Sequence, residues 1–438
     1  MNYDYLILGG GIAGLYSAYQ ILKKTPHARL ILLEKDDTLG GRVYTFTDKH
    51  MSVEAGAARF TQNHTHLWEL IHDLRLASKI RKISGEATFM KSVEGIYSMD
   101  LPIYHHSELT PHKIRELIAY HSNTDYSLIA ILTKIVSASY LDFFIDLHQI
   151  SFLNYAKKVV SAAEVQHIVD SFGYYSELVI MNAHDAIELM KHLSPDNQYY
   201  TLSGGLGQII SELARRILAF PHTKIIVGST VKSIHMIDGV SGGFMVEVSM
   251  SHNRYLQYYG NTCICALPKQ VVEKFAIFSP VKSLFNHLLC APLCRIYSKF
   301  ESTDGKVWFK GLPKLTTNNN LRMVIPISEK DGTIMMSYTD NKFADFWMKL
   351  YDKHGLRGVN RELMRLIEMT TGIIIPYPKD THVFYWKCGV GYWGVGADSK
   401  AISEKIACPY PGQKLYICGE HYSEKNQQWM EGALEYRV

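Results

Sequence analysis

The sequence has few cysteines, no block of like charges and no long apolar run. Seven cysteines in 438 residues are an odd number at low density, which argues against a disulfide framework and favours an intracellular, reducing compartment such as the cytoplasm. No stretch of about 18 uninterrupted apolar residues occurs, so we expect no membrane span. The basic residues are scattered and the net charge is only +4, so we expect no nucleic-acid partner.

The composition is that of a folded protein. Apolar residues make up 47% and charged residues 20% of the chain, which excludes a disordered or fibrous protein. A length of 438 residues is more than one compact core usually holds, so we expect two domains. The apolar run before Gly9 has the pattern of a strand, so we expect no secretory signal.

The N-terminal segment has the pattern of a β-α-β unit. Residues Tyr3–Leu8 are apolar and rich in β-forming side chains, and Ile12–Lys24 has apolar residues at helical spacing. Pro26 ends this helix, and Arg29–Leu33 is a second short apolar strand. The unit predicts an α/β fold built on a parallel sheet.

Three glycines lie between this strand and helix, in the pattern Gly9-x-Gly11-x-x-Gly14. Gly9 permits a tight turn, Gly11 lets the backbone approach a pyrophosphate, and Gly14 lets helix and strand pack closely. Free N–H groups at the helix N-terminus favour phosphates, and Glu34, 20 residues after the third glycine, can accept ribose hydroxyls. A purely structural turn would leave the combination of two strands, helix and acid unexplained. We therefore predict a dinucleotide-binding site.

The rest of the chain contains several further segments with helical or strand patterns. Long helical periods run from about 102 to 193, and Ser127–Leu147 within them is predicted to form a buried amphipathic helix. Two further helices are predicted over Gln208–Leu218 and Asn360–Met369. The predicted strands are Lys224–Val227, Val231–Ile237, Phe244–Met250, Cys263–Ala266 and Thr333–Tyr338.

Two cysteine pairs have spacings that match no zinc site. Cys263 and Cys265 are two residues apart in an apolar strand, and Cys290 precedes Cys294 by four residues. We interpret all four as packing thiols and expect no metal.

Further segments match one protein family in order along the chain. They are Leu39–Arg42, Glu54–Phe60, Ser203–Gly207, Ala266–Pro268, Ile417–Glu420 and Trp429–Leu434. Together with the glycine motif they resemble the flavin-containing amine oxidase superfamily of monoamine, polyamine and L-amino-acid oxidases. The resemblance implies a Rossmann-like FAD-binding domain (1–85, 200–285 and 386–438) interleaved with an α+β substrate-binding domain (86–199 and 286–385) that holds the helical insert.

The resemblance also assigns the contacts of a bound FAD. Those implied for the pyrophosphate, the ribose and the neighbouring phosphates are Gly9, Gly11, Gly14, Glu34, Gly41 and Arg42. Those implied for the adenine, the flavin ring, the ribityl chain and the pyrimidine edge are Val231, Gly56, Ala57, Gly419, Glu420 and Met430. A helix that starts near Met430 would turn its positive end toward the negative charge that develops on the flavin.

We expect the FAD to be bound non-covalently. Monoamine oxidases attach it through a cysteine just before the first aromatic residue of the substrate cage, and Gly391 stands at that place. Cys388 is the nearest cysteine in the sequence.

The resemblance places aromatic rings in front of the flavin. Trp429 and Tyr392 fit these positions, with Trp393 as the competitor of Tyr392 and ordinary core packing as the alternative for both. Arg59 and Tyr338 match the pair that binds the substrate carboxylate in L-amino-acid oxidases, and an arginine can grip a carboxylate with two hydrogen bonds. Arg59 binding to FAD or to an acid such as Glu54 is the alternative.

Two departures from the family stand out. Arg295 occupies the position where most of these oxidases carry a lysine that holds a water near the flavin, which puts rapid reaction with O2 in doubt because arginine stays charged. The sequence given ends at 438, so the last helix of the family is expected to be short.

The leading hypothesis is a FAD-dependent oxidase of amines or L-amino acids. Hydride would pass from the substrate Cα–H to flavin N5 to give an imine, and O2 would re-oxidise the flavin with release of H2O2. The rivals are a flavin dehydrogenase like phytoene desaturase or protoporphyrinogen oxidase, a sugar-nucleotide mutase, and a FAD-binding scaffold that has lost catalysis. A homodimer is left open.

Overall fold

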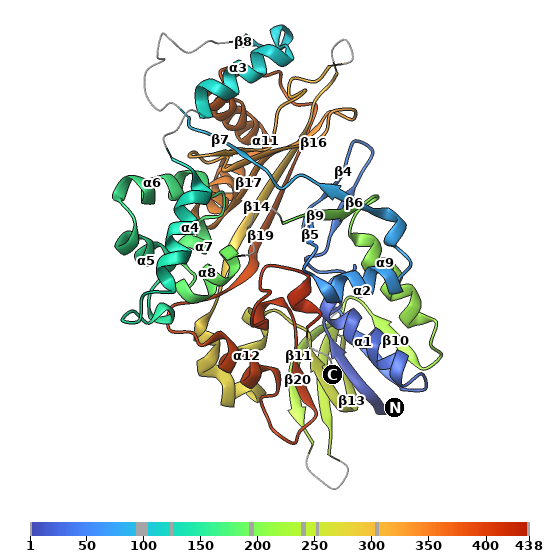
Figure 1. The fold of residues 1–438 in the computed structure, drawn as a ribbon. Helices are drawn as coiled ribbons and strands as arrows, with labels where there is room; N and C mark the ends of the chain where they lie inside the picture. The colour runs from blue at the N-terminus through green and yellow to red at the C-terminus, as the bar shows by residue number, and fades with distance from the viewer. Residues whose placement is uncertain are drawn as a thin grey trace.

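The protein is built on two large β-sheets that form its two halves (Figure 1). The computed structural model describes residues 2–92, 104–122, 126–191, 197–237, 242–250, 254–302 and 306–435. Both sheets combine with helices, so the predicted α/β fold with a Rossmann-like half and an α+β half is confirmed. The domain boundaries expected above stay a prediction.

The first sheet has seven strands and contains the N-terminal β-α-β unit. Its order is β10 (Thr223–Ile226), β2 (Leu30–Leu33), β1 (Asn2–Leu8), β13 (Arg254–Cys265), β12 (Phe244–Met250) and β11 (Thr230–Met236), with β20 (Leu415–Ile417) beside β13. Strand β1 runs parallel to both of its neighbours, β2 and β13. The strands and helices predicted for this half are confirmed, and most of their observed ends lie within a residue or two of the predicted ends.

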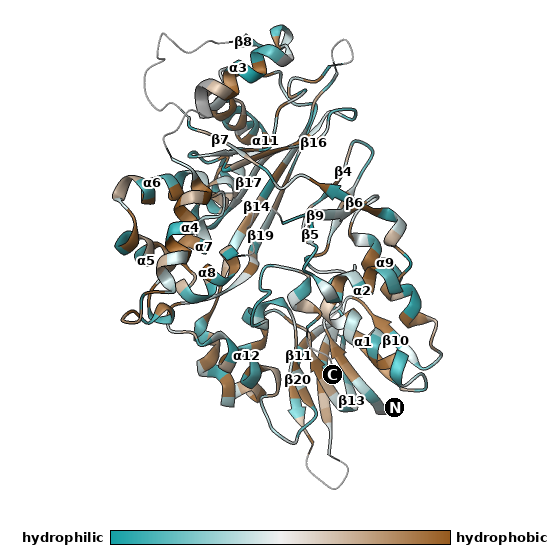
Figure 2. Cartoon of the chain, in the orientation of Figure 1, coloured by the Kyte–Doolittle hydropathy of each residue, from teal (hydrophilic) through white to brown (hydrophobic). Residues whose placement is uncertain are grey.

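Helices cover both faces of the first sheet. Helices α1 (Ile12–Lys24) and α9 (Gly207–Leu218) pack on one face, and α12 (Ser399–Ala407) with the 3-10 segment η5 (Ala276–His287) lies on the other. Figure 2 shows hydrophobic residues along the strands between these layers. Burial on both faces explains why Leu30–Leu33 is entirely apolar.

Small sheets lead from the first half toward the second. Strands β3 (Thr45–Thr47) and β4 (Ser52–Glu54) form a hairpin, and β9 (Tyr199–Leu202) lies between β5 (Phe60–Thr61) and β6 (Ile80–Ile83). Strands β8 (Tyr104–His105) and β18 (Ile373–Ile374) form another pair. The shorter helical elements are α2 (Thr65–Asp73), α10 (Lys269–Val272), η1 (Ala77–Lys79), η2 (His106–Glu108), η3 (Leu147–Gln149), η6 (Glu420–Tyr422) and η7 (Glu431–Ala433).

The second sheet has six strands. Their order is β19 (Asp380–Trp393), β14 (Leu288–Lys299), β17 (Thr333–Asp340), β16 (Met323–Ser328), β15 (Leu315–Thr317) and β7 (Thr88–Met90). Helices α11 (Asn341–Thr371) and α3 (Pro111–Ser122) lie against it (Figure 1). Helix α11 breaks at Gly355, whose φ of 60° interrupts the helical backbone, so the predicted helix Asn360–Met369 is its second part.

A group of helices lies beside the second sheet and has its own apolar core (Figure 1). It consists of α4 (Leu128–Ser139), α5 (Phe152–Val159), α6 (Ala162–Ser171), α7 (Tyr175–Val179) and α8 (Ala183–Lys191). The predicted helix Ser127–Leu147 is wrong in its second half, because α4 ends at Ser139. Phe143 and Phe144 beyond it are 86% and 99% exposed, so their apolar character does not reflect burial. No helix of the described residues is long and apolar enough to cross a membrane.

Candidate functional site

A cavity of about 2480 Å³ lies between the two halves and collects the predicted site residues. Those that line it are Gly9, Gly11, Glu34, Gly41, Arg42, Gly56, Ala57, Val231, Gly419, Glu420 and Met430 for the cofactor, and Arg59, Arg295, Tyr338, Tyr392 and Trp429 for the substrate. Gly14 does not line the cavity. Residues from widely separated segments of the chain thus meet in one space, although their roles stay predictions.

The glycine loop joins β1 to α1 at one end of this cavity. Gly9 has a φ of 105°, which favours glycine, and a Cβ on Gly14 would lie 2.0 Å from the Gly9 carbonyl oxygen. Gly14 therefore permits close packing of strand and helix. A Cβ on Gly11 would meet only the Gly40 oxygen, 3.9 Å away, so it would point into open space. This cradle fits a dinucleotide phosphate, because its surface is bare backbone next to a helix N-terminus.

Glu34 follows β2 directly and reaches back to the glycine loop. Its carboxylate accepts hydrogen bonds from the Gly10 N–H at 2.6 Å and the Asp36 N–H at 2.9 Å. The side chain is almost fully buried but still lines the cavity. Two amides fix the carboxylate, and its remaining lone pairs suit the hydroxyls of a ribose.

Arg42 and Glu420 form an ion pair in the middle of the cavity wall. Arg42 Nη1 lies 2.5 Å from Glu420 Oε2 and also donates to the Gly389 carbonyl at 3.0 Å. Burial alone would raise the pKa of Glu420, but Arg42, His421 and two backbone N–H groups together hold it below its usual value. Burial and the nearby Arg42 charge lower the pKa of His421 to about 4, so this imidazole is neutral at neutral pH.

The segment Glu54–Gly56 is one place where the two halves are in contact. Tyr297 donates to the Glu54 carbonyl at 2.7 Å and the Trp386 indole to the Ala55 carbonyl at 2.8 Å, both from the second sheet. Arg295 Nη1 donates to the carbonyls of Glu54 and Gly56. A Cβ on Gly56 would lie 1.9 Å from the Arg42 oxygen, so this close approach requires glycine.

Arg295 is therefore fixed mainly by the backbone. Its Nη2 also donates to the Tyr338 hydroxyl at 3.2 Å, and its guanidinium lies 4.5 Å from the centre of that ring. Its buried Nε has no hydrogen-bond partner among the described residues. Arg295 thus connects the Gly56 segment to Tyr338 and leaves one donor unused inside the site.

Arg59 lies among aromatic rings instead of against an acid. Its Nη2 donates to the Tyr174 hydroxyl at 2.8 Å, and its guanidinium lies 4.4 Å from the Tyr199 ring centre and 5.8 Å from that of Trp429. No described carboxylate forms an ion pair with it. Glu54 binds Thr45 and the Leu206 N–H instead, so the alternative of an Arg59–Glu54 pair is wrong.

Tyr392 and Trp393 are consecutive residues of β19, so their side chains lie on opposite faces of the strand. Tyr392 lines the cavity and is almost fully buried, with its pKa raised well above the usual value by burial and by Asp340 and Glu177. Trp393 does not line the cavity, and its indole donates to the carbonyl of Ser423. The geometry therefore favours Tyr392 over Trp393 as the cage residue.

Two titratable residues in the cavity escaped the sequence prediction. Burial and the neighbouring Asp340 raise the pKa of Glu177 to about 8, while burial and repulsion from Arg59 lower the pKa of Lys314 to about 7. Asp340 accepts the N–H groups of Tyr175 and Ser176 at 2.9 and 2.6 Å, which fixes the start of α7 and hence Glu177. No local motif marks either residue, because both come from segments that only the tertiary fold brings near Arg59.

Two expectations are wrong in detail. The helix expected from Met430 is a single 3-10 turn, η7, within the described residues, so it supplies no helix dipole of the kind proposed, and residues 436–438 lie outside the description. Cys290 is no packing thiol, since it forms a disulfide with Cys388. Cys263, Cys265 and Cys294 are free and buried, as predicted.

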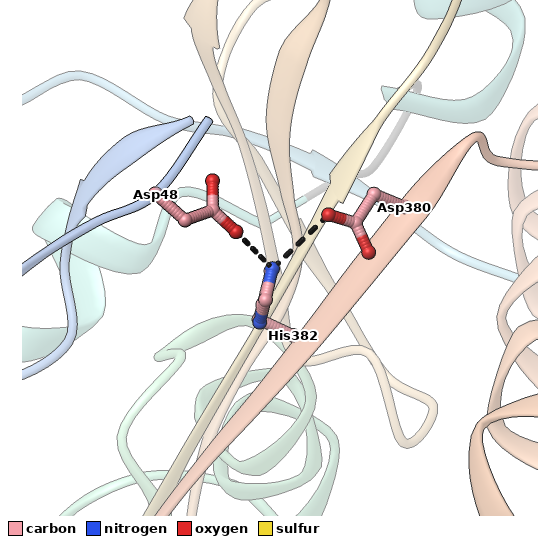
Figure 3. A group of neighbouring side chains, drawn as sticks. All are labelled: Asp48, Asp380 and His382. Carbon is pink, nitrogen blue, oxygen red and sulfur yellow. Dashed lines mark hydrogen bonds and ion pairs between the residues drawn. The ribbon is translucent and has the colours of Figure 1, made fainter. Parts of the chain in front are cut away.

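A group of three polar side chains lies away from this cavity. Asp48 from the β3–β4 hairpin and Asp380 from β19 lie on either side of His382 (Figure 3). The His382 Nε2 atom is 3.1 Å from an Asp48 oxygen and 3.2 Å from an Asp380 oxygen. The imidazole thus joins two carboxylates from different halves of the protein, which accounts for the group as a contact between the halves.

Comparisons with known proteins point to one family. The model of the flavin-containing amine oxidoreductases matches residues 12–436, nearly the whole chain. An uncharacterised protein of Acanthamoeba polyphaga mimivirus, R188, is 21% identical over 492 residues, which cover 99% of this chain and 92% of that protein.

Solved structures with the same fold include two forms of putrescine oxidase. A variant redesigned in its cofactor binding has a TM-score of 0.72 at 15% identity, covering 99% of this chain and 96% of its own. The wild type bound to putrescine has a TM-score of 0.71 at 15% identity, and the match covers 99% of this chain and 97% of that one. A provisionally named protoporphyrinogen oxidase from Exiguobacterium sp. 255-15 has a TM-score of 0.67 at 16% identity, and the match covers 99% of this chain and 96% of that one. At these identities the likeness establishes the fold.

Gly11 and Gly14 make a matched pair of tests. We expect Gly11→Ala to leave the thermal stability of the cofactor-free protein almost unchanged and to weaken FAD binding, because its Cβ enters open space in the cradle. Gly14→Ala should lower the melting temperature, because its Cβ meets the Gly9 carbonyl. Calorimetry and FAD titration check this; equal loss of stability in both variants would contradict it.

Glu177→Gln should change the pH dependence of stability. A carboxyl whose pKa rises on folding stabilises the protein below its unfolded pKa, and that contribution is lost as pH rises toward the folded value of about 8. The variant should therefore melt near the wild-type temperature at pH 5 and several degrees above it at pH 9. Thermal unfolding across this pH range checks the sign, and parallel curves for the two proteins would refute it.

Proposed function

Because this chain belongs to the flavin-containing amine oxidoreductases, we propose that it is a FAD-dependent oxidase of amines that carry a carboxylate, with L-amino acids as the leading class. The observation that carries the proposal is the Arg59 guanidinium, which lines the cavity without an acidic partner among the described residues. An arginine left unpaired in a largely buried site needs an anion, and a substrate carboxylate supplies one.

Bound FAD would supply the redox chemistry, taking a hydride equivalent from the substrate Cα–H to give an imine and passing the electrons to O2 as H2O2. The chain would hold it through the glycine loop, Glu34, the Arg42–Glu420 pair and the Gly56 segment. Non-covalent binding is part of the proposal, because residue 391 is glycine and Cys388 is already in a disulfide.

The rest of the chemistry belongs to protein side chains. Arg59 would orient the substrate carboxylate, with Tyr174 holding its guanidinium at 2.8 Å. Tyr392 and Trp429 would exclude water and guide the amine as an aromatic cage. An ammonium must lose its proton before oxidation, and Lys314, with a pKa of about 7, is a group in the cavity able to accept it near neutral pH.

The rival functions fit the site less well. A sugar-nucleotide mutase needs several arginines free for a diphosphate. Of the described arginines that line this cavity, Arg42 is paired with Glu420 and Arg295 is bound to backbone carbonyls, which leaves Arg59. A carbon-skeleton dehydrogenase needs no group for a carboxylate, whereas this cavity holds the Arg59 guanidinium with the hydroxyl of Tyr174. The proposal also retains O2 as the acceptor.

The deciding experiment is the visible spectrum of the purified protein under anaerobic conditions. We expect a flavin spectrum that bleaches with mixed L-amino acids and more slowly with simple amines or polyamines. A yellow protein that no amine bleaches would overturn the oxidase proposal in favour of a rival dehydrogenase, mutase or scaffold. A colourless protein that FAD does not reconstitute would remove the cofactor assignment itself.

Arg59→Met should separate amino acids from amines. Loss of a charged hydrogen-bond pair of about 1.5–3 kcal/mol should reduce kcat/KM for L-amino acids roughly 10- to 150-fold. Amines without a carboxylate should lose little, and Arg59→Lys should restore part of the amino-acid activity. Steady-state kinetics with both substrate classes measure this. An equal loss for both classes would mean that Arg59 supports the cavity and does not bind the carboxylate.

A further inference from the structure

The disulfide joins two neighbouring strands of the second sheet. Cys290 of β14 and Cys388 of β19 are 98 residues apart in sequence, and their Cα atoms are 5.3 Å apart. The strands are antiparallel, and their pairing shifts between Ala291 and Leu293.

The pairing shift places Cys388 in the wall of the cofactor cavity. Ala291 pairs with Val390 and Leu293 with Trp386, so Pro292 alone lies opposite Lys387–Gly389. Proline has no N–H to offer the partner strand, which favours such a bulge. Lys387, Cys388 and Gly389 all line the cavity, whereas Cys290 does not. Cys388 is thus the sulfur on the cofactor side.

Polar groups around Cys388 favour its thiolate form. His421 Nδ1 accepts the Lys269 N–H at 3.2 Å, and its Nε2 lies 3.1 Å from Arg42 Nη1 and 3.8 Å from the Cys388 sulfur. The Arg42 guanidinium binds the carbonyl of the adjacent Gly389 at 3.0 Å. A nearby cation such as the Arg42 guanidinium stabilises a thiolate and makes a sulfur reactive.

Other cysteines have the opposite environment. Cys263 and Cys294 are fully buried in apolar surroundings, and burial raises the pKa of each thiol to about 12. Burial likewise raises the pKa of Cys418 to about 11. These thiols are inert packing groups, whereas Cys290 and Cys388 are only partly buried. The contrast sets the pair apart from ordinary core cysteines.

We propose that Cys290 and Cys388 are a redox-active pair that exchanges two electrons with FAD bound in the cavity. Reduced flavin would give two electrons and two protons to the pair: the S–S bond breaks, each sulfur becomes a thiol, and the flavin returns to its oxidised state. The reverse exchange re-forms the disulfide. The inference rests on the proposed function only in requiring bound FAD, and it needs no particular amine.

The test is a reductive titration of the FAD-loaded protein. Wild type should consume about twice as much dithionite as its flavin alone requires, and alkylation followed by mass spectrometry should find both cysteines newly modified. Cys290→Ser and Cys388→Ser should consume only the flavin's share. Cys408→Ser, which removes a partly buried free cysteine, should behave like wild type. Cofactor-free wild type should keep its disulfide under the same treatment.

A spectrum gives an independent readout. Cys290→Ser leaves a free thiol at Cys388, which should produce a long-wavelength charge-transfer band with oxidised flavin, and Cys388→Ser should lack the band. A fully reduced flavin beside an intact disulfide would overturn the proposal. Flavin that stays attached to Cys388 after denaturation would also overturn it, by making this residue an attachment site. A protein that binds no FAD would refute the proposed function as well, and its lack of colour distinguishes that case.

Discussion

The backbone carbonyls of Glu54–Gly56 are the constraint on which the arrangement of the two halves depends. Buried carbonyls must find donors, and here the donors are side chains of the second sheet: Arg295, Tyr297 and Trp386. The segment that is expected to run beside the flavin ring is therefore fixed by the half that is expected to bind substrate. Moving either sheet would leave these carbonyls without partners.

This constraint explains why Arg295 and Arg59, which both line the cavity, have different partners. Arg295 uses its Nη groups on two carbonyls and the Tyr338 hydroxyl, so its charge is largely committed to structure. Among the described residues, Arg59 has only the Tyr174 hydroxyl and aromatic faces as partners. A lysine at position 295 could not bridge three acceptors in one plane, because its ammonium is a single point. The departure from the family pattern thus has a structural reason in this chain.

The sequence predicts local structure well where one segment is enough. The N-terminal β-α-β unit is marked by a strand pattern, a glycine turn and a helical pattern in succession, and α1 has the predicted bounds Ile12–Lys24. It fails where apolar residues are exposed, as at Phe144, since periodicity does not report which neighbours a side chain meets. Most of the site residues assigned from the resemblance do line the cavity, but Glu177 and Lys314 belong to no motif. Their perturbed pKa values arise from burial that only the complete fold creates.

One strand pair, β14 and β19, links these features. It carries Arg295 and Trp386 at the contact with Glu54–Gly56, Tyr392 in the cavity wall, and the Cys290–Cys388 disulfide. Reducing this disulfide would free the backbone at the bulge opposite Pro292, within the strands that hold the Gly56 segment. The redox state of the pair would therefore alter the backbone at the expected flavin position through the hydrogen-bonded strands, in addition to any direct transfer of electrons.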